Sequence, residues 1–169
     1  IYIIVNPTQK VSDIYNILLI KNTSNFNSLN LSKRNISLIR NKNSSNIDML
    51  KVNRYIQAYN PYLLEGDIIT FSKKRTEIHI NGGVHNDGIY EHIRNEKLFD
   101  FIDMIGGFTI NADTNNIEIY RANKNEQIYI NDYTADKNII LHPYDYINVQ
   151  QLKNYNDRNT VKIIGEVNT

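Results

Sequence analysis

Alternation between hydrophobic and polar positions predicts strands at several places along the chain. The clearest run is Ile78–Val84, which buries every second residue and then reaches the pair Gly82-Gly83. Asp87-Gly88 follows as a tight-turn signal, and Ile89-Tyr90 restarts an extended segment. A further alternating run, Ile117–Arg121, predicts another strand.

Between these strands the hydrophobic period changes to that of a helix. Positions i, i+3, i+4 and i+7 are Leu98, Phe101, Ile102 and Ile105. Asn95 stands where an N-cap is expected, Glu96 faces the positive end of the helix dipole, and Gly106-Gly107 provides a left-handed stop. We therefore predict an α+β unit with one helix across one face of a small mixed sheet, as in a β-grasp fold.

Several segments recur in the same order at a spacing of roughly 80 residues. The matched pairs are Val11–Leu18 with Leu98–Ile105, Asn35–Arg40 with Asn116–Arg121, Leu63–Phe71 with Leu141–Val149, and Ile78–Val84 with Val161–Val167. This pattern predicts tandem β-grasp-like units. Residues 1–72 would be a first unit lacking its opening strand, residues 77–150 a complete second unit, and residues 160–169 the opening strand of a third.

An opening strand without its own unit would expose unpaired backbone. We therefore expect Val161–Val167 to pair with a sheet edge, in this chain or in a neighbouring one. Two asparagine-rich stretches, Asn22–Asn30 and Asn41–Asn46, are interpreted as loops.

Composition and charge restrict the classes of function that the chain could have. The chain has 169 residues, of which 41% are hydrophobic, enough for a folded core. A net charge of +1 gives no electrostatic reason to expect nucleic acid as a partner, and the absence of cysteine excludes disulfides and thiolate metal sites. No run reaches the roughly 18 apolar residues of a membrane span, and no signal peptide is visible. Because the first residue is Ile1, we expect a processed product or a fragment.

Candidate chemistry is sparse. His79 and His92 would lie near each other across a hairpin turn at Asn86-Asp87, and with His85 or Asp87 they could hold a metal. We favour a solvent-facing strand position for His79, and we predict no metal and no cofactor.

The acidic and basic candidates have structural interpretations as well. Asp100 and Asp103 could resemble a catalytic pair, but the wet face of the helix is the preferred interpretation. Asp67 and Asp145 are expected to cap backbone amides in turns, and Arg40 and Arg121 to pair with a local acid rather than a ligand. No catalytic residue is predicted.

These motifs resemble the soluble-ligand-binding β-grasp (SLBB) domain of bacterial outer-membrane polysaccharide export proteins. Three motifs carry the resemblance: Ile-x-Ile-x-Gly-x-Val-x-x-x-Gly-x-Tyr from Ile78, Leu-x-Asp from Leu98, and Gly-Gly-Phe-Thr from Gly106. Asp87 replaces a usual proline, and Ile105 a usual alanine. The positions assigned to the structural motif are Gly66, Asp67, Gly82, Gly88, Tyr90, Asp100, Gly106, Gly107, Arg121, Asp145 and Gly165.

The resemblance implies a non-enzymatic periplasmic component of capsule or exopolysaccharide export. Its SLBB units would mediate assembly of a homo-oligomeric ring and line the conduit, and regions outside this chain would associate it with the outer membrane. Polysaccharide and an inner-membrane export or polymerisation protein are the implied partners. The alternative is a stand-alone soluble-ligand or glycan-binding module in another periplasmic or surface assembly.

Overall fold

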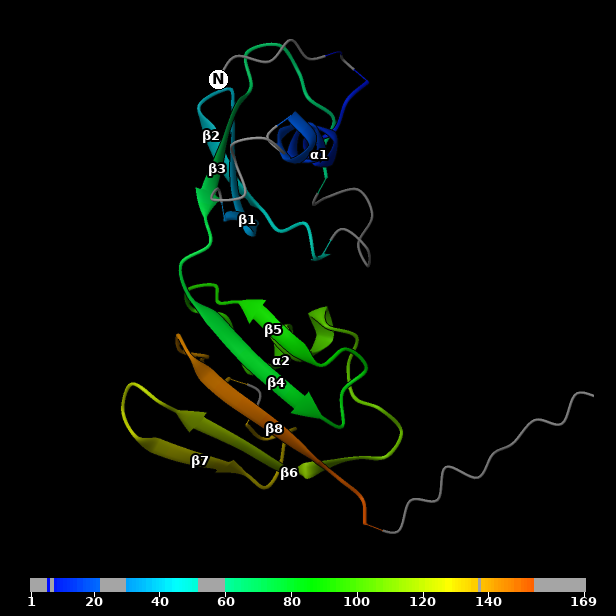
Figure 1. Cartoon of the computed structure of the whole chain (residues 1–169), viewed down its shortest axis with the longest axis vertical. Helices are drawn as coiled ribbons and strands as arrows, with labels where there is room; N and C mark the ends of the chain where they lie inside the picture. Colours follow the sequence, from blue (N-terminus) through cyan, green and yellow to red (C-terminus); the bar gives the residue numbers. More distant parts are fainter. Residues whose placement is uncertain (1–5, 7, 22–29, 52–59, 137, 154–169) are drawn as a thin grey trace, which may run out of the picture.

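Two β-sheets, each packed against a helix, make up the described part of the chain. The computed structural model describes residues 6, 8–21, 30–51, 60–136 and 138–153. Figure 1 shows the two sheets at opposite ends of the longest axis of the molecule. The mixture of helices and strands confirms the predicted α+β class.

The N-terminal sheet is antiparallel and has the strand order β2-β1-β3. Its strands are β1 (Leu31–Arg40), β2 (Asn43–Ile47) and β3 (Ile68–Lys73), and the helix beside it is α1 (Val11–Lys21). The helix contributes Val11, Ile14 and Tyr15 to a small core. From the sheet and the segment before β3 come Ile36, Leu38, Ile47 and Leu63.

The interpretation of Asn41–Asn46 as a loop is wrong for most of its length. Only Asn41 and Lys42 form the turn, both with positive φ, and β2 begins at Asn43. The first four residues of β2 are exposed and polar, so no hydrophobic alternation marks the strand. Its backbone pairing with β1 creates the strand instead. The other predicted loop, Asn22–Asn30, lies outside the described residues except for Asn30.

The C-terminal sheet has five strands in the order β5-β4-β8-β6-β7. They are β4 (Glu77–Gly82), β5 (Gly88–Glu91), β6 (Ala112–Arg121), β7 (Glu126–Ile130) and β8 (Asp145–Gln151). The central pair β4 and β8 is parallel, whereas the other neighbours are antiparallel. Strand β8 is the last of the five in sequence, yet it lies between β4 and β6 in the sheet.

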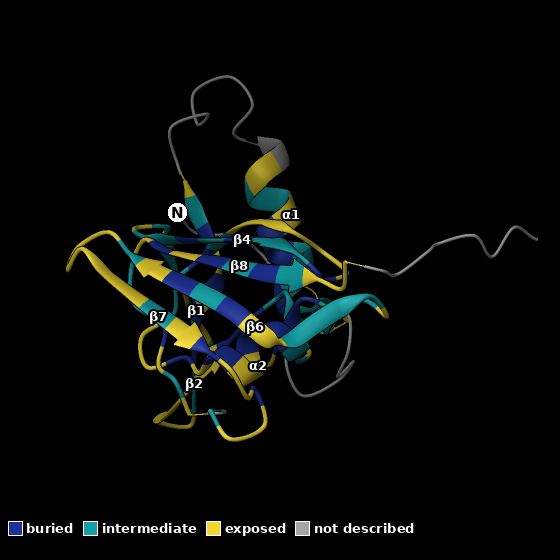
Figure 2. Cartoon of the chain, turned by 90° about the horizontal axis from the view of Figure 1, so that it is seen from below, coloured by how far each residue is buried: buried dark blue, intermediate teal, exposed yellow. Residues whose placement is uncertain are grey.

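Helix α2 (Leu98–Met104) covers one face of this sheet, as predicted. It buries Leu98, Phe101, Ile102 and Met104. The inward positions of the strands complete the core with Ile78, Ile80, Ile117, Ile119, Ile130, Ile147 and Val149. Figure 2 shows the resulting alternation as dark and light bands along β6 and β8. The alternate side chains of each strand therefore point to the face of the sheet opposite α2.

The start of α2 differs from the prediction, whereas its end agrees. Lys97, not Asn95, is the N-cap and makes no side-chain capping bond, while Asn95 has a φ of 61°. The amide of Leu98 instead donates to the carbonyl of Ile139 at 2.8 Å. At the other end Gly107, with positive φ, donates its amide to the carbonyl of Ile102, which confirms the glycine stop.

Gly82 has a steric reason for being glycine. It ends β4 beside β8 with a φ of 93°, and a Cβ placed there would lie 2.0 Å from the carbonyl oxygen of Val149. That same oxygen accepts a 2.8 Å hydrogen bond from the amide of Gly83. A side chain at Gly82 would therefore push apart the two strands that hold the sheet together.

The two sheets share one turn geometry. Arg40 at the end of β1 binds Asp67, and Arg121 at the end of β6 lies 3.4 Å from Asp145. Each aspartate also accepts a 2.9 Å hydrogen bond from the backbone amide three residues earlier, as predicted. The tandem repeat itself stays a prediction, and Val161–Val167 lies outside the described residues.

A buried arginine joins the two sheets. Arg34, on β1, is 1% exposed and lies on the inward face of its strand, two residues before Ile36. Its Nε donates to Asp48 at 3.0 Å, and its Nη1 donates to the carbonyl of Glu91 at 2.7 Å. Both terminal nitrogens bind the carboxylate of Glu96, just before α2. One guanidinium therefore connects β1, the segment after β2, the end of β5 and the approach to α2.

Burial and pairing act in opposite directions in this cluster. Burial alone would lower the pKa of Arg34, but the hydrogen bonds and charges of Glu96 and Asp48 raise it above its usual value. Burial raises the pKa of Glu96, and Arg34 opposes that rise. Without the guanidinium, two carboxylates would be left buried together.

We predict that Gly82→Ala lowers the free energy of unfolding by about 3 kcal/mol, because the new Cβ overlaps the β8 backbone. Gly88→Ala is the control, since Gly88 has a positive φ but no atom within 4 Å of the added Cβ. We expect the control to cost about 1 kcal/mol of backbone strain. Urea unfolding measures both, and equal losses would contradict the steric explanation.

We also predict that Arg34→Met lowers the free energy of unfolding by about 3–5 kcal/mol, because it leaves the carboxylates of Asp48 and Glu96 buried without a cation. Arg40→Met removes the more exposed ion pair with Asp67 and should cost about 1 kcal/mol or less.

Adding Glu96→Gln to the Arg34→Met variant should recover part of the loss. The Arg34→Met variant should also gain stability as the pH falls, because burial raises the pKa of Glu96 in the folded state and protonation then neutralises this carboxyl. If unfolding shows neither the recovery nor this pH dependence, unpaired charge is not the cause.

Candidate functional site

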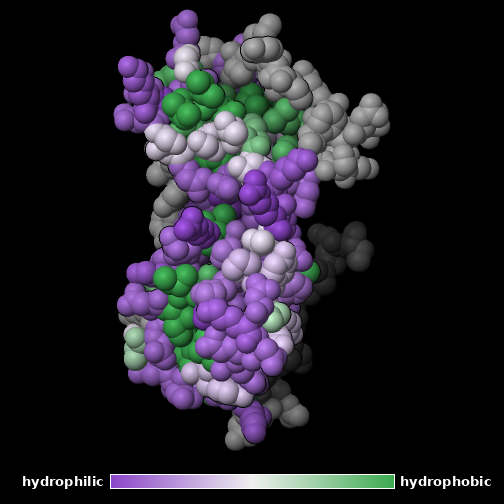
Figure 3. All heavy atoms as spheres, turned by 90° about the vertical axis from the view of Figure 1, so that its left-hand side faces the viewer, coloured by the Kyte–Doolittle hydropathy of each residue, from purple (hydrophilic) through white to green (hydrophobic). Residues whose placement is uncertain are grey.

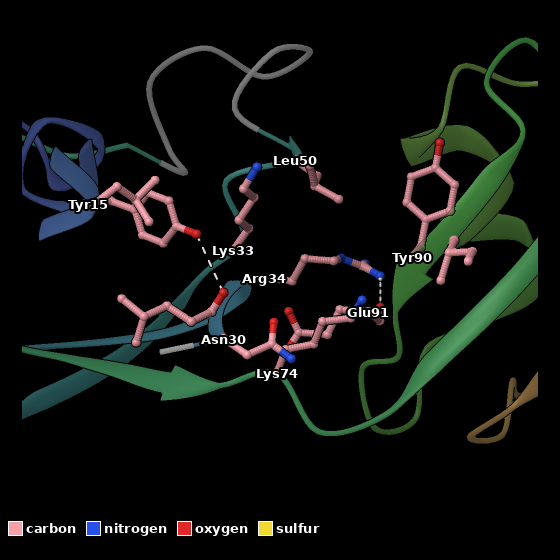
Figure 4. A pocket seen from close by; sticks show the side chains of 11 residues that line it. Tyr15, Asn30, Lys33, Arg34, Leu50, Lys74, Tyr90 and Glu91 are labelled. Carbon is pink, nitrogen blue, oxygen red and sulfur yellow. Dashed lines mark hydrogen bonds between the residues drawn. The ribbon is translucent and has the colours of Figure 1, made fainter. Parts of the chain in front are cut away.

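A pocket of about 790 Å³ lies between the two sheets. Tyr15 of α1 borders it from the N-terminal side, and Tyr90 and Glu91 of β5 border it from the other. Figure 4 shows the Arg34 side chain crossing the space between them toward Glu91. The pocket is therefore built where the two sheets meet.

Most polar groups on its wall already have partners. The Glu91 carboxylate accepts a 2.7 Å hydrogen bond from the Ser32 hydroxyl, and Lys74 lies 3.0 Å from Glu77. Burial raises the pKa of the Tyr15 and Tyr90 hydroxyls, so both stay protonated at neutral pH. The Ser32–Glu91 hydrogen bond joins the two sheets, and none of these groups forms a nucleophile with an adjacent base.

The face of the C-terminal sheet opposite α2 carries a row of rings. Strand pairing places His79 of β4 beside Tyr146 of β8, and Tyr146 beside Tyr120 of β6. The rings of His79 and Tyr146 are 6.2 Å apart and inclined by 33°. Tyr146 is 44% exposed and Tyr120 is 43% exposed. We name His79, Tyr146 and Tyr120 the ring row.

A polar row runs beside the ring row, two residues further along the strands. Asn81 pairs with Asn148, Asn148 with Glu118, and Glu118 with Tyr129. The Asn81 amide nitrogen donates to the Tyr146 hydroxyl at 2.9 Å, which links the two rows. The Asn81 Oδ1 is buried and has no hydrogen-bond partner among the described residues. We name Asn81, Asn148 and Glu118 the polar row.

The structure gives several predicted motif residues structural contacts. Gly66 has a positive φ in the turn before Asp67. Tyr90 packs its ring edge-on against Phe101 at 5.4 Å and donates its hydroxyl to the carbonyl of Asn86. Asp100 is exposed on α2, in agreement with the wet-face interpretation. Gly165 lies outside the described residues.

The expected proximity of His79 and His92 is wrong. His79 pairs with Ile89, and the backbone amide of His92 donates to Thr76, three residues before His79. The hairpin register is set by Ile80 pairing with Gly88, so the turn takes up more residues than Asn86-Asp87 alone. Within the described residues no group of three or more potential ligands could hold a metal ion. No described helix is long and apolar enough to cross a membrane.

Sequence reasoning missed both the arginine joint and the ring row. Arg34 could have been found by extending the alternation of Ile36 and Leu38 backwards, which places an arginine on the inward face of β1. The ring row depends on register between strands that are distant in sequence, and alternation within one strand does not fix that register.

Comparison with known proteins gives one result that bears on this site. No curated protein matches the chain. The family model described as "SLBB domain" matches residues 78–131, from the start of the β4 core to the end of β7. That range includes His79, Asn81, Glu118, Tyr120 and Tyr129 of the exposed sheet face, whereas β8 lies beyond it. Residues 78–131 of this chain therefore match the SLBB domain.

Proposed function

We propose that this chain is a non-enzymatic part of a periplasmic polysaccharide export apparatus, in which its SLBB units assemble a ring and line the conduit. The observation that carries the proposal is the SLBB match over residues 78–131. An SLBB domain is a soluble-ligand-binding module, and the polysaccharide, the ring and the periplasmic location are the parts that we add by analogy.

The shape and the surface of the chain support an assembly role. Strands β2, β3, β5 and β7 are the outer strands of the two described sheets. Leu64 and Ile68, just before and at the start of β3, are exposed hydrophobic residues. Figure 3 shows hydrophobic residues gathered in the upper and the lower part of one face, with a hydrophilic belt between them. Such surfaces suit contact with further protein units.

The second candidate is a stand-alone ligand-binding module in another periplasmic or surface assembly. The pocket of about 790 Å³ at Arg34 favours it, because its volume is that of a small-molecule site. Its polar groups, however, are already engaged in joining the sheets. We therefore rank the export role first.

We predict that cells lacking the full-length protein lose polysaccharide from the surface and accumulate polymer inside, because synthesis continues while export fails. Complementation with the wild-type gene should restore surface polymer, and complementation with the Gly82→Ala variant should restore less than Gly88→Ala does. Surface and internal polysaccharide are quantified in each strain. An unchanged amount of surface polysaccharide in the deletion strain would contradict the export role and favour the stand-alone binding module.

A further inference from the structure

We infer that the ring row and the polar row together form a binding surface for an extended, neutral, equatorially linked glycan. This inference rests on the proposed function, which supplies the polysaccharide, and assigns its contact to one face of one sheet. The residues concerned are His79, Tyr120 and Tyr146 in the ring row and Asn81, Asn148 and Glu118 in the polar row.

The spacing of the rings is the first argument. The three rings come from three neighbouring strands in register, β4, β8 and β6. The rings of His79 and Tyr146 on neighbouring strands lie 6.2 Å apart, a distance of the same order as one sugar unit in an extended chain. A glycan crossing the strands would thus offer successive sugar faces to successive side chains. The C–H face of a sugar packs on the face of an aromatic ring.

The hydrogen-bonding groups are the second argument. The Tyr146 hydroxyl accepts a hydrogen bond from Asn81, which leaves its own proton to donate. The buried Oδ1 of Asn81 is an acceptor without a partner among the described residues. An unpaired buried acceptor is costly, so turning the Asn81 amide outward to meet a ligand hydroxyl would relieve that cost. Amides and hydroxyls in a line match the hydroxyl groups of a sugar chain.

Charge selects among glycans and among other partners. The two rows contain no lysine or arginine, and Glu118 is the only acid in them. An anionic polysaccharide would meet the carboxylates of Glu118 and of Glu77 beside His79, while the nearby Lys74 is already paired with Glu77. A second copy of the chain would have to desolvate the amides and Glu118 to reach the rings. A neutral glycan can hydrogen-bond to the polar row and pack against the rings of the ring row at the same time.

The test is an NMR titration of the whole chain with three hexasaccharide probes. Cellohexaose is neutral, extended and equatorially linked, maltohexaose is neutral but curved, and hexagalacturonate is anionic. Cellohexaose should shift the amide signals of β4, β6 and β8 around the two rows. Tyr120→Ala and Tyr146→Ala should each weaken its affinity about tenfold.

Tyr62→Ala is the matched control, because Tyr62 is 56% exposed but lies outside the C-terminal sheet. The Tyr62→Ala variant should bind cellohexaose with the affinity of the unmodified chain. Urea unfolding should show that all three tyrosine variants are folded. Asn81→Ala should lower the affinity for cellohexaose without altering the fold of the sheet.

Four results would overturn the inference: no shift with cellohexaose, shifts that survive in both tyrosine variants, tighter binding of maltohexaose or hexagalacturonate, or concentration-dependent shifts of the same face without sugar. The last would mean that a second copy occupies the face. Export in cells is measured separately. Loss of binding by a folded variant tests this surface, whereas normal export in the deletion strain would remove the proposed function itself.

Discussion

The arrangement of the two sheets depends on the burial of a single guanidinium. Arg34 extends from β1 and binds groups from both sheets, so neither sheet can move away without leaving a buried charge or carbonyl unpaired. Glu96 accepts bonds from both terminal nitrogens of Arg34 and stands two residues before the start of α2. The pocket beside Arg34 follows from this constraint: side chains of both sheets converge on the cluster, and the space between them is not filled by the described chain.

The same constraint explains which parts of the fold the sequence predicts. Core strands and the hydrophobic stripe of α2 follow directly from alternation and helical spacing, because burial selects those side chains one by one. The start of α2 does not follow from these hydrophobic patterns. A local capping rule favoured Asn95, whereas the structure uses Glu96 to bind Arg34, 62 residues earlier in the chain. The sequence does not predict strand β2 either, because four of its five residues are exposed and polar and give no hydrophobic alternation.

The candidate binding face was hidden from sequence reasoning in a different way. Each tyrosine is recognisable as a half-exposed strand residue, but the line from His79 through Tyr146 to Tyr120 appears only after two strand pairings are known. One of these pairings, between β4 and β8, is parallel and joins residues more than sixty positions apart. No turn signal fixes such a register, because a parallel connection passes through the whole intervening unit.

Alternation along a strand lets one sheet serve two purposes without compromise. Inward residues such as Ile80, Ile119 and Ile147 pack under α2, and their immediate neighbours Asn81, Tyr120 and Tyr146 point to the other face. The core fixes the strand register, and the register in turn fixes the spacing of the exposed rings. A binding face built in this way is preorganised by packing that it does not touch. Its side chains can therefore vary with the ligand while the fold, held by α2 and Arg34, stays the same.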